Sequence, residues 1–119
     1  MNKLGFAGRL ASAPVQTGSG DRAVVKFTLI RNDYAGKDEE GSSREKKTSI
    51  QFTAFRGKGE AIAMNCMKGD QLIVTARIEN NNWTDKEEVE HYGYNFVVEE
   101  FDFGAPGPDR RAILEQREK

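Results

Sequence analysis

Apolar and polar residues alternate along five short segments of the chain, and this alternation predicts β-strands with one buried face. The five segments are residues 3–10, 23–31, 48–55, 72–80 and 90–103. Glycine, proline, serine and charged residues fill the stretches between them and favour turns and loops. The longest such stretch, residues 32–47, predicts a polar loop of a length that is often functional in compact domains.

One segment has a helical period. Residues 60–67, "EAIAMNCM", contain good helix formers, and their apolar side chains fall on one helix face. We expect Gly57 and Gly59 to end the preceding strand before this helix begins, and Gly69 to end the helix. Three strands, a helix and two more strands follow the order of the OB-fold, a partly open Greek-key barrel. The pattern therefore predicts an all-β fold: a five-stranded OB-fold barrel with one helix between strands 3 and 4.

Alternation along the third predicted strand assigns its side chains to two faces. Ile50, Phe52 and Ala54 form the apolar face, which we expect to point into the core. Phe55 falls on the opposite face with polar neighbours. An aromatic side chain on a polar face is a candidate for contact with a ligand.

The fourth predicted strand leads into the stretch that holds the only tryptophan. Its core-facing set is Leu72, Val74, Ala76 and Ile78. Arg77 then lies on the outer face. Trp83, in the polar stretch "NNNWTD", falls on the same side as Arg77 if the strand stays extended, whereas a bulge would reverse the assignment.

Three aromatic side chains are predicted to be exposed beside polar and basic residues: Tyr34, Phe55 and Trp83. Such rings stack on unpaired nucleic-acid bases of any sequence, which contributes on the order of 1–3 kcal/mol per base. Each ring taken singly has an ordinary alternative, because isolated surface aromatics are common and aromatics also fill protein interfaces. Their agreement on one face favours the binding hypothesis.

Basic side chains on the same strands and loops form a candidate track for a phosphate backbone. The candidates are Lys26, Arg31, Lys47, Arg56, Arg77 and Lys86. Acidic side chains oppose this track, at residues 38–40 of the long loop and at residues 85–90 after Trp83. Because carboxylates repel phosphates within about 8–10 Å, the positive track is expected to be narrow.

Composition limits what the chain can do. Its 119 residues suffice for one domain. Its net charge of −1 differs from the strongly positive net charge that indicates nucleic-acid binding. No apolar run is long enough to span a membrane, and the first residues do not resemble a signal peptide. The lone Cys66 allows no internal disulfide and fits a reducing compartment, so we expect a cytoplasmic location.

Catalytic chemistry is not predicted. His91 is the only histidine and has no partner suggested by spacing, and Cys66 falls on the core-facing side of the predicted helix. The sequence has no metal-ligand cluster and no nucleotide-binding fingerprint. We therefore expect a protein that is not an enzyme, with no catalytic residues, no metal and no cofactor.

Several stretches together resemble the bacterial-type single-stranded DNA-binding proteins. "MNKLGFAGRL" is similar to that family's opening strand, and "VVKFTLIRN" to its second strand. "AFRGKGEAIAMNCMKGDQLIVTARI" resembles, without a gap, the aromatic end of the third strand, the helix, the Lys-Gly turn and the fourth strand. "NNNWTD" resembles the family's Trp-Thr-Asp loop, and the resemblance extends over residues 1 to about 103.

The resemblance implies a homotetramer of OB-folds that binds single-stranded DNA in replication, recombination and repair. The family's stacking aromatics fall on Tyr34, Phe55 and Trp83, and Arg56 matches a basic position after the third strand. A further family aromatic, in the third strand, falls on Ser49. This departure is expected to weaken or reroute binding on that face.

The resemblance also divides the chain into residues 1–103, the OB-fold DNA-binding domain, and residues 104–119, a short flexible tail in which an isolated helix would be marginal. The family typically ends in an acidic cluster closing in Pro-Phe, which recruits replication and repair enzymes. This chain ends "DRRAILEQREK", so recruitment through such a tip is not expected. These departures suggest a divergent relative carried by a plasmid, phage or integrated element.

A second interpretation is an OB-fold accessory protein of replication or conjugation that acts mainly through protein contacts. It would be similar to the primosomal replication protein, a dimer with the same ancestry. Ser49 and the acidic residues after Trp83 favour this interpretation. The aromatic side chains of Tyr34, Phe55 and Trp83 favour DNA binding.

Overall fold

The computed structural model describes residues 1–117 of the chain. Its elements, in chain order, are β1 (Leu4–Leu10), β2 (Val15–Thr17), the 3-10 turn η1 (Gly20–Arg22), β3 (Val24–Lys37), β4 (Ser43–Phe55), α1 (Arg56–Asn65), β5 (Gln71–Asn80), β6 (Trp83–Thr84), β7 (Glu90–His91), β8 (Tyr94–Phe103) and α2 (Pro108–Arg117). None of the helices in this range is long and apolar enough to cross a membrane.

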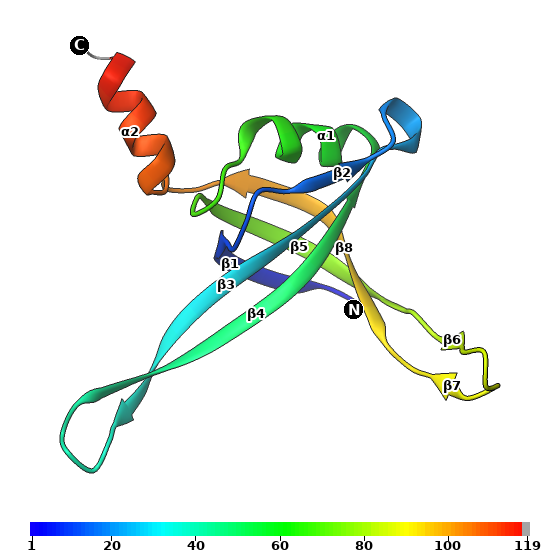
Figure 1. Cartoon of the computed structure of the whole chain (residues 1–119), viewed down its shortest axis with the longest axis horizontal. Coiled ribbons are helices and arrows are strands. Elements are labelled where there is room, and N and C mark those ends of the chain that lie inside the picture. The colour runs from blue at the N-terminus through cyan, green and yellow to red at the C-terminus, as the bar shows by residue number, and fades with distance from the viewer. Residues whose placement is uncertain (118–119) are drawn as a thin grey trace.

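Five strands close into a barrel (Figure 1). Their order is β1-β5-β8-β4-β3, and Arg9 and Leu10 at the end of β1 pair with Ile30 and Leu29 of β3 to complete the ring. The short β2 pairs with the start of β3, and α1 lies across the same end of the barrel (Figure 1). The predicted five-stranded OB-fold barrel, with one helix between its third and fourth strands, is confirmed.

Phe52 lies at the centre of the core. Its side chain is fully buried, and its ring centroid lies 5.8–6.1 Å from those of Phe6, Phe27 and Phe96. Ala54, on the same face of β4, is also buried, whereas Phe55 is 42% exposed. The predicted division of this strand into a core face and an outer face is confirmed.

One predicted core residue of the next strand lies at the surface. Ile78 is 38% exposed, although Leu72, Val74 and Ala76 before it are buried. The pairing between β1 and β5 ends at Leu4 and Ala76, so β1 no longer covers the strand beyond that point. The prediction of a buried Ile78 is wrong because β5 continues past the end of the barrel.

The helix α1 begins earlier than predicted. It starts at Arg56 and ends at Asn65, so Gly57 and Gly59 lie inside it rather than before it. Gly59 is buried, and a Cβ atom at this position would lie 2.7 Å from the carbonyl oxygen of Ala54. Glycine lets the first turn of the helix touch the end of the barrel, which a larger side chain would prevent.

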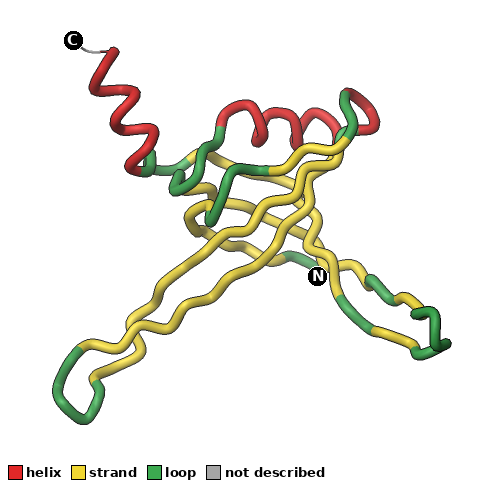
Figure 2. The backbone as a smooth tube through the Cα atoms, viewed as in Figure 1, coloured by secondary structure: helices red, strands yellow, loops and turns green. Residues whose placement is uncertain are grey.

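The predicted polar loop at residues 32–47 is mostly strand. β3 and β4 continue as an antiparallel pair through Tyr34 and Glu45 and project from the barrel as an arm (Figures 1 and 2). The carboxylate of Asp38 accepts hydrogen bonds in the turn that closes this β3–β4 arm. The loop prediction is wrong because both faces of the arm lie in water, so its sequence needs no apolar alternation.

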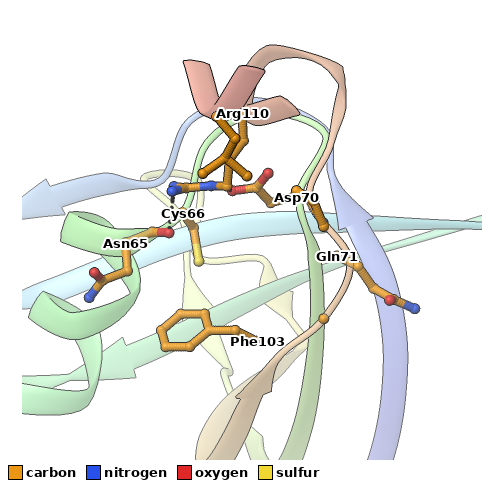
Figure 3. Close-up of a pocket in the computed structure, with 9 residues that line it drawn as sticks. Asn65, Cys66, Asp70, Gln71, Phe103 and Arg110 are labelled. Carbon is orange, nitrogen blue, oxygen red and sulfur yellow. Dashed lines mark hydrogen bonds and ion pairs between the residues drawn. The ribbon is translucent and has the colours of Figure 1, made fainter. Parts of the chain in front are cut away.

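The last described helix, α2, is fixed to the barrel by its first turn. Arg110 Nε donates to Asp70 Oδ2 at 2.7 Å, and an Nη of the same side chain donates to the carbonyl of Asn65 at 2.7 Å (Figure 3). The Gly107 N–H donates to the other oxygen of Asp70 at 2.9 Å. Residues 118–119 of the predicted tail lie outside the described residues, and the domain division after residue 103 stays a prediction.

Candidate nucleic-acid interface

A groove on the outer face of the barrel gathers three of the predicted site residues: Phe55, Arg56 and Arg77. We call it the Phe55 groove; its volume is about 520 Å³. Its charged lining contains four cations and two carboxylates, namely Arg22, Arg56, Lys58, Arg77, Asp21 and Glu79. The groove therefore combines a half-exposed aromatic ring with a local excess of positive charge, in a chain whose net charge is −1.

The turn from β4 into α1 sets the positions of Phe55 and Arg56. Phe55 ends the strand on its outer face, and Arg56 has a φ of 57°, in the left-handed region that side chains other than glycine rarely adopt. The Arg56 N–H donates to the Ala23 carbonyl at 2.9 Å, which holds this turn against the residue that precedes β3. Backbone outliers of this kind persist only where the surroundings fix them, and they cluster at functional sites.

Arg77 enters the groove from β5. It lies opposite Val97 of β8, and its Nε is 2.8 Å from Glu79 Oε1 on the same face of the strand. Both side chains are more than 40% exposed, so this ion pair contributes at most about 1 kcal/mol. The Arg77 guanidinium can therefore exchange this carboxylate for another anion at small cost.

The register between β3 and β4 decides which other predicted residues share the face of Phe55. Val24 lies opposite Phe55, and Lys26 opposite Thr53. Directly paired residues lie on one face of a sheet, and so do residues two apart. By this count Lys26, Tyr34 and Lys47 all lie on the face of Phe55, with Tyr34 67% exposed on the β3–β4 arm.

Arg31 does not share that face. It lies opposite Thr48, one residue out of phase with Lys26 and Tyr34. Its Nε is 2.8 Å from Asp33 Oδ1. The structure thus places Arg31 on the other side of the sheet from Phe55.

Trp83 lies apart from the Phe55 groove, on a hairpin formed by β6 and β7. Its side chain is 52% exposed, and its ring stacks on that of His91 with a centroid distance of 4.9 Å and an interplanar angle of 13°. Asn81 and Asn82 interrupt the strand before it, so alternation from Arg77 does not carry through to Trp83. Lys86 lies exposed in the turn of the same hairpin.

Asp85 holds the turn of the β6–β7 hairpin. One of its oxygens accepts hydrogen bonds from the N–H groups of Glu87 and Val89, and the other lies 2.8 Å from His91 Nε2. The bonds from His91 and from these backbone groups lower the pKa of Asp85 below its ordinary value. The carboxylate that contacts the His91 ring of this stack is therefore charged at neutral pH and engaged within its own hairpin.

Sequence reasoning missed two residues that border this surface. Arg22 lines the Phe55 groove from η1, and Tyr94 is a 67% exposed ring at the start of β8. The loop between the first two barrel strands commonly binds ligands in OB-folds, which was an available signal for Arg22. The signal for Tyr94 was the density of aromatics in "HYGYNF".

A separate cavity of about 320 Å³ lies between the end of α1, β8 and α2, away from the predicted site residues (Figure 3). Cys66 lines it. Burial and the neighbouring charge of Asp70 raise the pKa of the Cys66 thiol to about 11, despite the opposing charge of Arg110. A thiol that stays protonated is a poor nucleophile. Within residues 1–117, no group of three or more His, Cys, Asp or Glu side chains is arranged to hold a metal ion.

Comparison with known families and curated proteins gives consistent matches. A model described as the single-strand binding protein family matches residues 1–104. A single-stranded DNA-binding protein of Clostridium perfringens is 37% identical over 106 residues, which span 87% of this chain and 65% of that protein. Mitochondrial single-stranded DNA-binding protein 1-B of Xenopus laevis is 27% identical over 111 residues, which span 87% of this chain and 75% of that protein. The chain thus spans about two thirds to three quarters of the length of these relatives.

Comparison with solved structures supports the same fold. A structure described as a Plasmodium falciparum SSB complex with single-stranded DNA superimposes with a TM-score of 0.72. The match covers 87% of this chain and 95% of that chain at 16% sequence identity.

Proposed function

We propose, since the chain belongs to the single-strand binding protein family, that it binds single-stranded DNA without sequence preference. The observation that carries this proposal is the Phe55 groove, where a half-exposed ring lies among Arg22, Arg56, Lys58 and Arg77. An aromatic ring accepts any base by stacking, and cations accept the phosphates on either side.

The proposed binding surface continues beyond this groove on the shared face of β3 and β4. Lys26 lies two residues from the strand position opposite Phe55, and Tyr34 and Lys47 extend the same face along the β3–β4 arm. In this proposal Lys26 and Lys47 bind phosphates and Tyr34 stacks on a base. Arg31 lies on the other face of the sheet, so it would contact a phosphate only where the DNA strand passes around the edge of the arm.

Trp83 and Lys86 would bind a separate part of the DNA strand. His91 covers one face of the Trp83 ring, so the other face is the one open to a base. Asp85 and its acidic neighbours repel phosphates, and Lys86 is the nearest cation in the turn that can offset them. We infer that a base, rather than a phosphate, approaches the Trp83 ring.

We further propose that the protein acts in DNA replication, recombination or repair in the cytoplasm, that it is not an enzyme, and that it assembles as a homotetramer, with a dimer as the alternative. Within β1, the pairings with β3 involve Arg9 and Leu10, while residues Leu4 to Gly8 pair with β5 alone. The other edge of these residues is open to a second copy of the chain, since exposed strand edges favour further pairing. Light scattering of the purified protein would distinguish a tetramer from a dimer.

A second candidate function is a replication or conjugation accessory protein that acts mainly through protein contacts. The acidic β6–β7 hairpin favours this alternative, because Asp85, Glu87, Glu88 and Glu90 follow Trp83 in the chain. Binding of a partner protein would not require a phosphate near the ring.

Titration with oligo-dT separates the two functions. The chain has one tryptophan, so its emission reports on Trp83 alone. We expect oligo-dT to quench this emission and oligo-dC to bind comparably, with affinity that falls as salt rises because bound cations are displaced from the phosphates. A matched duplex should bind much more weakly.

Substitution of Trp83 tests its role in the proposed DNA binding. Trp83→Ala should weaken binding roughly 5- to 150-fold in a gel-shift assay, as expected for the loss of one stacked base. Circular dichroism should show an unchanged fold. Absence of both quenching and a gel shift at low salt would exclude DNA binding and leave the protein-contact function.

A further inference from the structure

A second groove lies where β4 and β8 separate. The two strands run parallel and are joined by the pair Thr53 and Val97, and they diverge beyond it (Figure 1). The space between them has a volume of about 210 Å³ and is bordered by Lys26, Ser49, Gln51, Tyr94 and Asn95. We call it the β4–β8 groove.

The β4–β8 groove continues the Phe55 groove along one strand. Ser49, Gln51, Thr53 and Phe55 alternate along β4 and therefore share its outer face. Ser49 and Phe55 are six positions apart on this strand, a distance of about 20 Å. A DNA strand that leaves Phe55 along β4 passes directly over the β4–β8 groove.

The charge of the β4–β8 groove suits a phosphate-bearing ligand, because no carboxylate in its lining opposes the cation that it contains. Its lining contains Lys26 and no carboxylate, whereas the Phe55 groove includes Asp21 and Glu79, and the groove beside Trp83 includes Glu90. Gln51 and Asn95 add amide groups that can hydrogen-bond to the edges of bases.

The small side chain of Ser49 leaves room for a base in this groove. Ser49 lies opposite Ile30 on the outer face of the sheet, at the position where the resemblance in sequence places an aromatic ring. Tyr94 borders the same space from β8 with 67% of its surface exposed. Within the described residues, none of the stacked or edge-on aromatic pairs includes its ring.

We propose that Tyr94 is a base-stacking residue, and that an unpaired nucleotide occupies the β4–β8 groove with its base on Tyr94 and its phosphate on Lys26. This inference rests on the proposed binding of single-stranded DNA. In this proposal Tyr94 of β8 supplies the aromatic ring that the resemblance places at position 49 of β4. The groove therefore retains one aromatic contact although position 49 is a serine.

Substitution of Tyr94 tests the proposal. Tyr94→Ala should weaken binding of oligo-dT roughly 5- to 150-fold, whereas Tyr94→Phe keeps the ring and should bind within about twofold of the unaltered protein. Phe103→Ala is the matched control, because Phe103 is a half-exposed ring at the other end of β8 and lines the cavity of Figure 3. This control should leave the affinity unchanged.

A second measurement reports contact directly. Oligo-dT that carries 5-bromodeoxyuridine should form an ultraviolet crosslink to Tyr94, which mass spectrometry of the tryptic peptides would locate. In the Tyr94→Ala background, Ser49→Trp should recover binding, because it returns a ring to the same groove from the other strand. A merely structural role for Tyr94 would give neither the crosslink nor the recovery.

The outcomes separate this inference from the function on which it rests. If the unaltered protein binds oligo-dT but Tyr94→Ala binds equally well and no adduct forms at Tyr94, the inference is wrong and the proposed function stands. If the unaltered protein does not bind oligo-dT, the proposed function itself is wrong. Loss of binding in Tyr94→Ala, retention in Tyr94→Phe and a crosslink at Tyr94 would establish the inference.

Discussion

Phe55 and Trp83 have similar exposed fractions, 42% and 52%, but they offer a base different surroundings. Phe55 lies among arginine and lysine side chains that can hold the adjacent phosphates. Trp83 is stacked on His91 in an acidic hairpin, so a base placed on it would extend an existing stack. At the scale of single residues, we expect Phe55 to couple stacking to salt-dependent binding more strongly than Trp83 does.

The ion pair between Arg77 and Glu79 gives a prediction at this scale. Glu79→Gln removes a carboxylate from the Phe55 groove and frees the Arg77 guanidinium for a phosphate. Because an exposed ion pair contributes about 0.2–1 kcal/mol, the affinity for oligo-dT should rise roughly 1.5- to 5-fold at low salt. Fluorescence titration would measure this change.

The matched control is Glu115→Gln, which removes the same charge from an exposed position on α2. This variant should bind as the unaltered protein does. Equal gains from both variants would show that only the net charge of the chain matters and that Arg77 is not a phosphate contact.

At the scale of elements, alternation in the sequence predicted the strands that have one buried face. It did not predict the strand segments that have no buried face. The alternation around Phe52 predicted β4 within the barrel, whereas the β3–β4 arm is polar on both faces and was predicted as a loop. Phe55 was predictable as an outer residue for the same reason. The grouping of Arg22 with Arg77 could not be predicted from the sequence, because it depends on the positions of η1 and β5 in the folded barrel.

The two glycines of α1 give a prediction at this scale. Gly59→Ala places a methyl group 2.7 Å from the Ala54 carbonyl oxygen and 2.9 Å from a methyl group of Val25, so the helix must shift away from the barrel. Overpacking of this kind costs about 1–3 kcal/mol in the free energy of unfolding. Urea denaturation would measure the loss.

Gly57→Ala is the matched control in the same helix, because a Cβ atom at position 57 meets nothing within 4 Å. Replacing glycine by alanine at such a helical position should raise the free energy of unfolding by up to about 1 kcal/mol. If both variants were equally stable, the contact between Gly59 and Ala54 would not determine how α1 packs.

At the scale of the whole molecule, the described chain is more extended than its length requires. Its radius of gyration is 17.3 Å, whereas a compact domain of this size has about 13.5 Å. The β3–β4 arm, the β6–β7 hairpin and α2 all project from the barrel and contribute to this extension (Figure 2). The arm and the hairpin carry Tyr34, Lys47, Trp83 and Lys86, so these two projections enlarge the proposed binding surface without enlarging the core.

Asp70 gives a prediction for the stability of the whole molecule in acid. Burial raises the pKa of this carboxyl, but hydrogen bonds from Gly107, Arg110 and Met67 outweigh burial and hold the pKa below its ordinary value. The carboxylate therefore stabilises the fold above about pH 4, its range in the unfolded chain, and this contribution is lost as pH falls through the lower pKa of the folded state.

We expect the free energy of unfolding to fall between pH 5 and pH 2 more steeply in the unaltered protein than in Asp70→Asn. The variant should be less stable at neutral pH, because an amide cannot accept all of these hydrogen bonds. Asp109→Asn, on the exposed first turn of α2, should keep the unaltered slope. Identical slopes in Asp70→Asn and the unaltered protein would show that Asp70 does not contribute to acid unfolding.

The arm has a consequence for engineering. Its turn, residues 38–42, is exposed and closed by local hydrogen bonds to Asp38, and its strands pair only with each other beyond the barrel. Exposed turns of this kind tolerate insertions best. A fluorescent tag or a second domain could therefore be inserted directly after Glu40, at the tip of the arm, with the barrel left intact.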